Sequence, residues 1–210
     1  MLLYDADWAP NPRRVRVFLA EKGIEVPRVA VDLRAGEHRQ DAYREINPRA
    51  TVPALRLDDG EVIGDSVAIC RYLEALHSDP PLFGATPVEV ARVEVWTRRI
   101  EQDGYLALVQ AFRESHPGFE SRPMPGDWPP LPQIPALGER ARTVWGAFLD
   151  GFDAHLADRE WVAGDRFSFA DITGLVAVDF ARAARVDGPE TRPNVHRWRE
   201  AVGARPSAMA

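Results

Sequence analysis

The sequence has little of several features that mark common classes of protein. Cysteine occurs once, as Cys70, so no internal disulfide can form, and this suits the reducing cytoplasm. No apolar run approaches the roughly 18 residues that span a bilayer. No basic leader of a secretory signal precedes the first apolar residues. We therefore expect a cytoplasmic protein that has no membrane partner.

Lysine is also almost absent, because Lys22 is the only one among the 26 basic residues and the others are arginines. The formal net charge is −6, and acidic residues outnumber basic ones both in residues 1–80 and in the remainder. This balance excludes a basic nucleic-acid-binding module. The five histidines show no spacing typical of metal ligands, so no metal site is predicted.

The pattern of apolar residues divides the chain into two parts. Residues 1–79 alternate short apolar runs with helical stretches in the order βαβαββα, which predicts a small sheet with mixed strand directions. Residues 80–86 hold two prolines and a glycine, which indicate a linker. Residues 87–210 show only helical patterns. We therefore predict an α+β protein in which a thioredoxin-like domain is followed by an all-helical domain.

The expected elements follow from periodicity and from turn residues. In the first domain they are strands over 2–4, 26–31, 54–57 and 62–63, and helices over 12–21, 41–46 and from 66 onward. In the second domain they are helices over 87–110 and 141–156, and two more that start near 168 and 193. Ser168 and Asp171 have the spacing of a capping box, and Phe167 and Ile172 can form the hydrophobic staple around it.

The segment 47–73 carries the most information about function. Val52-Pro53 places a proline at the start of a strand, and a cis bond there would turn the Val52 N–H and C=O toward a ligand. Asp65-Ser66 caps the next helix, where free N–H groups attract an anion. Each piece alone is consistent with a plain hairpin or a capped helix. Together they describe a pocket for a small peptide with a free carboxylate.

This ordered set resembles the thioredoxin-like domain of cytosolic glutathione transferases, in which a cis-proline and an acidic-Ser pair hold the tripeptide. Residues 164–172 resemble the family's buried capping motif, and residues 193–207 resemble its closing helix. The resemblance covers nearly the whole chain. Its exception is the segment 113–135, which holds seven prolines and cannot be one helix. That segment either forms a wall of a substrate pocket or simply packs as an ordered loop.

The resemblance implies chemistry on the thiol of glutathione, which must be ionised near neutral pH. A cysteine-like thiol has a pKa of about 8.5, so holding it ionised at about pH 7 requires roughly 2 kcal/mol of stabilisation. A helix N-terminus or one hydrogen bond to the ion supplies an amount of that order. One donor at the start of the first helix is therefore enough.

The start of the first helix resembles zeta-, theta- and omega-like transferases from Arg14 onward. Those classes place Ser or Cys five residues earlier, where this chain has Ala9, which has no side-chain donor. Asn11 is the nearest remaining donor, and some bacterial transferases are similar in using an asparagine there. We therefore predict that Asn11 stabilises the thiolate. The alternative that Asn11 only caps the helix stays open, and the two roles are compatible.

The resemblance also implies how the rest of glutathione is held. His38 is expected to meet the glycine carboxylate, and a solvated loop histidine is the competing interpretation. Val52, next to Pro53, pairs its backbone with the cysteinyl unit. Asp65 takes the γ-glutamyl ammonium group, and Ser66 takes the γ-glutamyl carboxylate at the helix start.

The leading interpretation is a glutathione transferase, typical of detoxification, that joins the sulfur of its co-substrate glutathione to a small apolar electrophile. It would act as a homodimer and without a further cofactor. One alternative is a glutathione-dependent reductase of disulfides or peroxides. A two-cysteine exchange is excluded, because no C-x-x-C motif occurs and Cys70 is misplaced. The other alternative is a non-catalytic glutathione-binding or regulatory module, which would explain Ala9.

Overall fold

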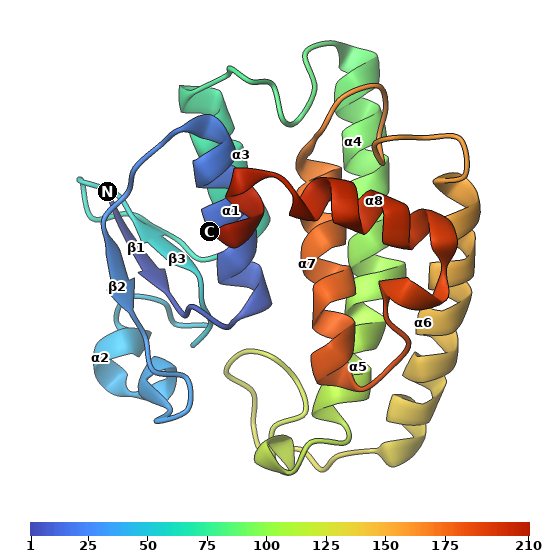
Figure 1. The fold of residues 1–210 in the computed structure, drawn as a ribbon. Coiled ribbons are helices and arrows are strands. Elements are labelled where there is room, and N and C mark those ends of the chain that lie inside the picture. The colour runs from blue at the N-terminus through green and yellow to red at the C-terminus, as the bar shows by residue number, and fades with distance from the viewer.

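The computed structural model describes residues 1–210, and the first part of the chain is built on a four-stranded sheet (Figure 1). The strands are β1 (Leu2–Asp5), β2 (Arg28–Ala30), β3 (Ala54–Arg56) and β4 (Val62–Ile63), in the spatial order β2-β1-β3-β4. β1 runs parallel to β2 and antiparallel to β3, so that Leu3 lies opposite both Arg28 and Leu55. The strand directions are therefore mixed, as predicted.

Helices cover both faces of this sheet. On one face lie α1 (Pro10–Lys22) and α3 (Ser66–Leu76), which pack against each other. On the other face, the short α2 (Asp41–Arg44) brings Tyr43 against Tyr4. Leu55 of β3 belongs to the first buried cluster and its neighbour Ala54 to the second, because successive residues of a strand point to opposite faces.

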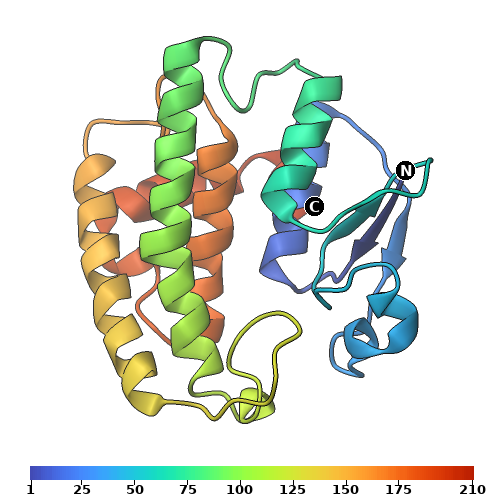
Figure 2. The same ribbon diagram turned by 180° about the vertical axis from the view of Figure 1, so that it is seen from behind.

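The second part of the chain is helical (Figures 1 and 2). Its helices are α4 (Pro87–Arg99), α5 (Leu106–Arg113), α6 (Pro135–His155), α7 (Phe169–Ala184) and α8 (Pro193–Gly203). The mostly buried α7 packs against α1, α4, α5 and α8. None of the helices combines the length and the apolar character that crossing a membrane demands. A thioredoxin-like sheet followed by helices confirms the predicted α+β fold.

Several elements differ in their bounds from the expectation, since α1 begins at Pro10 and not at residue 12, and α6 begins at Pro135 and not at residue 141. The helix predicted over 87–110 consists of α4 and α5, joined without interruption by a π-helical turn, Ile100–Tyr105. A Cβ atom at Gly104 in this turn would lie 2.7 Å from the ring of Phe148, so only glycine lets α6 approach so closely. The strand predicted over 26–31 is shorter, because β2 lies at the edge of the sheet and pairs only with β1.

Ion pairs on α1 hold the two parts of the chain together. Arg13 pairs with Asp179 of α7 at 2.7 Å. Glu21 pairs with Arg205 near the C-terminus, also at 2.7 Å. Figure 1 shows the C-terminal segment returning to lie against α1. The first helix of the chain is thus fixed to α7 and to the segment that follows α8.

The end of α1 is fixed by Lys22, whose side chain is fully buried. Its ammonium group pairs with Glu74 of α3 and donates to the carbonyl oxygens of His77 and Pro80, in the connection to α4. Gly23 then ends the helix in the left-handed region at φ 63°.

The start of α7 is organised around the buried carboxylate of Asp171. This carboxylate accepts from the backbone N–H and the hydroxyl of Ser168 at 3.0 and 2.9 Å, and the predicted capping box is confirmed. It also accepts from the Val162 N–H and from Trp198 Nε1 of α8, each at 2.9 Å. Burial raises the pKa of Asp171 to about 6, and these donors act in the opposite direction. One carboxylate thus joins α7, α8 and the loop before α7.

Replacing Asp171 by Asn should lower the free energy of unfolding by about 1–3 kcal/mol, because an amide NH₂ group cannot accept the hydrogen bonds that a carboxylate oxygen accepts. Urea unfolding at neutral pH measures this loss. Asp158→Asn is the matched control, because Asp158 is 79% exposed and its pair with Arg159 contributes little. A loss for Asp171→Asn no larger than that of the control would contradict the role of Asp171.

Candidate functional site

A cavity of about 420 Å³ lies where the start of α1, the segment before β3 and the start of α3 meet. Its lining residues are Asn11, Asn47, Arg49, Thr51, Val52, Pro53, Ile63, Gly64, Asp65, Ser66, Ala68 and Pro125. The cavity thus brings together five of the predicted site residues, namely Asn11, Val52, Pro53, Asp65 and Ser66.

The edge of the cavity next to β3 offers free backbone groups. The Val52-Pro53 peptide bond is cis, and the N–H and C=O of Val52 form no hydrogen bond within the chain. The preceding turn is held by Thr51, whose carbonyl oxygen accepts from the Asn47 side chain at 2.8 Å and from the Tyr43 hydroxyl at 2.7 Å. Val52 is therefore held in place with one donor and one acceptor available to an extended peptide.

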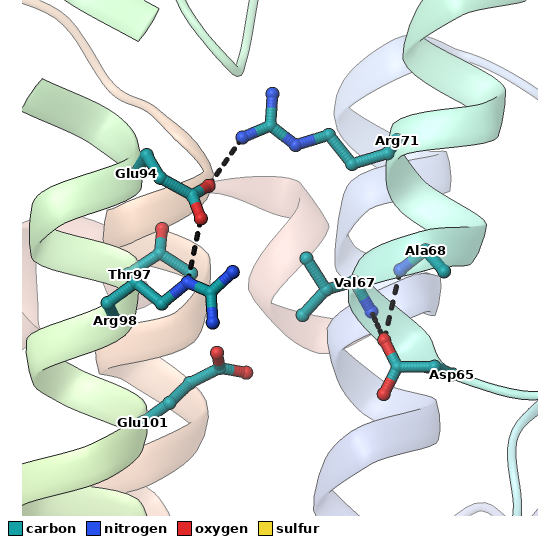
Figure 3. A pocket seen from close by; sticks show the side chains of 8 residues that line it. All are labelled: Asp65, Val67, Ala68, Arg71, Glu94, Thr97, Arg98 and Glu101. Carbon is teal, nitrogen blue, oxygen red and sulfur yellow. Dashed lines mark hydrogen bonds and ion pairs between the residues drawn. The ribbon is translucent and has the colours of Figure 1, made fainter. Parts of the chain in front are cut away.

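The start of α3 is capped by its own acidic residue (Figure 3). Asp65 Oδ1 accepts from the backbone N–H of Val67 at 2.9 Å and of Ala68 at 3.0 Å, which confirms the predicted N-cap. The second oxygen of this exposed carboxylate accepts no hydrogen bond from the chain. The cap leaves the N–H of Ser66 free, and the Ser66 hydroxyl accepts from Arg14 Nη1 at 3.3 Å. Anion binding at this helix end is therefore limited to Ser66.

Asn11 lies inside α1 rather than ahead of it. The helix begins at Pro10, and its N-cap residue is the buried Ala9, which makes no side-chain cap. The alternative role of Asn11 as the helix cap is therefore wrong. The Asn11 side chain lines the cavity and makes no hydrogen bond to another group of the chain. Its carboxamide is thus available to a ligand atom at the N-terminal end of α1.

His38 lies in a 3₁₀ turn and is not among the residues that line the cavity. Burial lowers the pKa of His38 to about 4, and the guanidinium groups of Arg39, Arg122 and Arg113 act in the same direction. Its Nδ1 atom is buried without a hydrogen-bond partner. The imidazole is therefore uncharged at neutral pH. The positive charge around His38 is carried by these three arginines.

The proline-rich segment 113–135 borders the cavity. Pro125 is one of the lining residues, and Arg44 of α2 pairs with Asp127 of the segment at 2.6 Å. Arg113 supports the segment from its other end by donating to the carbonyl oxygens of residues 122–124. In both ribbon views the segment extends from the helices toward the sheet (Figures 1 and 2). The structure favours the interpretation in which this segment walls a pocket.

A second cavity of about 420 Å³ lies between α3 and α4 (Figure 3). Most of its charged groups pair with each other, since Glu94 binds Arg71 at 2.6 Å and Arg98 at 2.8 Å. Glu101 also lines this cavity and accepts from Arg14 Nη1 at 2.7 Å. No group of three or more His, Cys, Asp or Glu side chains that could hold a metal ion occurs in the structure. This cavity therefore offers fewer free groups to a ligand than the first.

Arg14 belongs to the neighbourhood of the site, although the sequence did not identify it as part of the site. It is 2% exposed and lies between Ser66 and Glu101. The available signal was its position four residues before the apolar Phe18, which places both residues on one face of the helix. A cation on a buried face requires partners, but their positions in the sequence, 52 and 87 residues away, cannot be found from local pattern.

Comparison with known families matches two parts of the chain. The N-terminal domain of glutathione S-transferases matches residues 8–76, and the C-terminal domain of the same family matches residues 135–206. Glutathione S-transferase 2 of Saccharomyces cerevisiae is 34% identical to the chain over 209 residues, which cover 99% of this chain and 87% of that protein.

Solved structures give the same result. The structure of Gtt2 from Saccharomyces cerevisiae has a TM-score of 0.90 and 33% identity, and the match covers 100% of both chains. A glutathione S-transferase domain-containing protein from Marinobacter aquaeolei has a TM-score of 0.88 and 38% identity, over 99% of both chains. These matches extend from end to end and include both domains, and the chain therefore belongs to the glutathione S-transferase family.

Proposed function

We propose that this glutathione S-transferase binds glutathione in the cavity beside Val52 and Ser66 and joins its sulfur to a small apolar electrophile. The observation that carries the proposal is the convergence of Asn11, Val52, Asp65 and Ser66 on one cavity, although they come from three separate segments. Each of them offers a free group that a different part of the tripeptide requires.

The γ-glutamyl end of glutathione sits at the start of α3 in this proposal. The free oxygen of Asp65 accepts from the ammonium group, and the N–H and hydroxyl of Ser66 donate to the carboxylate. The cysteinyl unit pairs with the free N–H and C=O of Val52 beside cis-Pro53, in the manner of an added strand. We propose that the glycine end extends beyond the lining residues of the cavity to neutral His38, which donates a hydrogen bond to the carboxylate, while the nearby arginines supply the charge.

The sulfur then lies at the N-terminal end of α1, where Asn11 donates to the thiolate. The thiol proton leaves to solvent, the sulfur forms a bond to the electrophilic carbon, and the leaving group departs with its bonding electrons. The hydrogen bond and the helix end together contribute roughly 2–4 kcal/mol, which is enough to keep a thiol ionised at about pH 7. Cys70 takes no part, because it is fully buried and burial raises its pKa.

The electrophile is proposed to be apolar because exposed apolar side chains lie on the segments that border the cavity. Met124, which is 45% exposed, directly precedes the lining residue Pro125, and Trp128, which is 54% exposed, donates from Nε1 to the Pro125 carbonyl oxygen at 2.8 Å. Trp8, which is 57% exposed, lies in the loop that leads into α1. Large apolar side chains held in contact with water near a ligand cavity favour an apolar substrate.

The two parts of the chain have different roles in this proposal. Residues 1–79 bind glutathione, residues 80–86 are the linker, and residues 87–210 contribute to the electrophile site and the dimer contact. We place the two-fold contact on the α3–α4 side, where Leu76, Val88 and Val95 are each more than half exposed. Val88 and Val95 are two turns apart and therefore share one face of α4.

The wild-type protein should be retained on immobilised glutathione and should conjugate glutathione to a chlorodinitrobenzene, because the thiolate displaces the aromatic chloride. Ultraviolet absorbance of the conjugate measures the rate. Failure to bind glutathione would contradict the proposal. Turnover of a mixed disulfide without any conjugation would support the reductase in its place, and binding without either reaction would support a non-catalytic module.

Replacing Asn11 by Ala should raise the pKa of the bound glutathione thiol by about 1–2 units, because the thiolate loses a hydrogen bond worth roughly 1.5–3 kcal/mol. The pH dependence of thiolate absorbance in the binary complex measures this pKa. Asn194→Ala is the matched control, since Asn194 binds Asp153 on α6. An unchanged thiol pKa in Asn11→Ala would remove Asn11 from the reaction.

Replacing Val95 by Glu should convert the dimer to a monomer, because a charge placed in an apolar contact loses its water without gaining a partner. Light scattering during gel filtration gives the mass. Val144→Glu on α6 is the control, because Val144 is also exposed, at 42%, but lies on a helix outside the proposed contact. A Val95→Glu variant that remains a dimer would place the contact elsewhere.

A further inference from the structure

Three arginines gather around His38, between the 3₁₀ turn Glu37–Arg39 and the proline-rich segment 113–135. Arg39 belongs to the turn, whereas Arg113 and Arg122 belong to the segment. Burial is the main cause of the low pKa of His38, and the guanidinium groups of all three arginines add to it. Burial also lowers the pKa of Arg122, and Arg39 lowers it further. The three cations therefore share one small region of the molecule.

This arginine cluster is short of negative charge. None of its three guanidinium groups forms an ion pair with a carboxylate. Arg113 donates to backbone carbonyl oxygens, and the neighbouring Glu114, whose carboxylate accepts from the Ile134 N–H at 2.6 Å, is the acidic side chain that favours its charge. The side chains of Arg39 and Arg122 donate to no group of the chain. Two cations of the cluster are thus without a partner.

Acidic residues close by in sequence do not supply the missing charge. Glu37 accepts from the Asp32 N–H at 2.7 Å, and Asp127 pairs with Arg44 at 2.6 Å. Glu120 is exposed, where water and salt screen its carboxylate. The glycine carboxylate of glutathione brings a single negative charge. The cluster therefore keeps positive charge even when glutathione is bound.

The partnerless guanidinium groups are held in place by their own neighbours. The Arg122 Cζ atom lies 5.1 Å from the centre of the Phe119 ring, and Arg113 Cζ lies 4.0 Å from the same centre. This ring packs edge-on against α5. Arg39 folds back over Gly36, where a Cβ atom would lie 3.0 Å from its Nη2 atom. Both groups are thus positioned before any ligand arrives.

The cluster lies on the two segments that approach the proposed position of the sulfur. Pro125, which lines the first cavity, follows Arg122 by three residues. On the other side, Arg34 Cζ lies 5.7 Å from the centre of the Trp8 ring, so the loop that carries Arg34 and the 3₁₀ turn contacts the loop that leads into α1. Asn11 lies just beyond that loop. A substrate that reacts at the start of α1 is therefore within reach of the arginines.

We propose that Arg39 and Arg122 bind an acidic group of the electrophile, a carboxylate or a sulfonate carried by an otherwise apolar body. This inference rests on the proposed function and narrows its substrate, because it assumes that the thiolate of glutathione lies at the start of α1. The sulfur forms its bond to the electrophilic carbon, and the leaving group departs with its bonding electrons. The acidic group is unchanged by the reaction, and its contact with the arginines orients the apolar body.

The test compares two electrophiles of the same shape, a chloronitrobenzoate and the corresponding chloronitrobenzamide. Glutathione displaces the aromatic chloride from both, and the absorbance of the conjugate gives kcat/KM. Dividing each value by the rate constant of the uncatalysed reaction removes the difference in intrinsic reactivity. The wild type should favour the benzoate by about 10-fold, because only the anion gains charge-assisted hydrogen bonds from arginine.

The variants Arg122→Gln and Arg39→Gln remove one charge each and keep a side chain of similar length. Each should lower kcat/KM for the benzoate by about threefold or more and that for the benzamide by less than about twofold, and the double variant should lose the preference. Arg140→Gln is the matched control, because Arg140 is an exposed arginine on α6 outside the cluster. It changes the net charge by the same amount and should leave the preference intact.

Three results would overturn the inference. The first is a wild type that does not favour the benzoate, in rate or, where both compounds react slowly, as an inhibitor of chlorodinitrobenzene turnover. The second is an equal loss for both electrophiles in the Arg39 and Arg122 variants with a raised KM for glutathione, which would restrict these arginines to the glycine carboxylate. The third is the same loss of preference in Arg140→Gln. Absence of glutathione binding and of chlorodinitrobenzene turnover would instead refute the proposed function, which keeps the two failures distinguishable.

Discussion

Helix α1 is packed on both sides, and the geometry of the candidate site depends on this packing. One side of α1 contacts α3, and the other contacts α7 and the C-terminal turn. Sliding the helix would break the ion pairs of Arg13 and Glu21 and would expose the fully buried Phe18. Asn11 and Arg14 are carried on this helix, so their distances from α3 are set by a packed core. Sites built on rigid elements hold their geometry more closely than sites built on loops.

Apart from Arg49, which lines the cavity, the positively charged groups near the cavity are kept away from its surface. Burial keeps the imidazole of His38 neutral, and Asp65 occupies two amides at the start of α3. The buried cation closest to Ser66, Arg14, lies behind the cavity wall. Neutral donors can select an anion by geometry, without the strongly basic surface that would attract polyanions. This arrangement agrees with an overall net charge of −6.

Features that depend on neighbouring residues were predictable from the sequence, and features that depend on distant contacts were not. The capping box of Ser168 and Asp171 and the Asp65 cap each involve residues within a single turn, and all were found at the expected positions. The position of Asn11 inside α1 was not predicted, because the chain offers two prolines at which the helix can begin. The ion pair between Arg14 and Glu101 joins residues 87 positions apart, and local periodicity holds no information about it.

The burial of Lys22 has a practical consequence for anyone who handles the protein. Since it is the only lysine and its side chain is fully buried, no lysine amine is displayed on the outside of the fold. Aldehyde fixatives, succinimidyl dyes and carbodiimide-activated resins act on side-chain amines and will find none there. The exterior cations are guanidinium groups, which stay protonated across the whole working range of a buffer. Tethering or cross-linking this enzyme through its side chains therefore calls for dicarbonyl reagents or for coupling through its carboxylates.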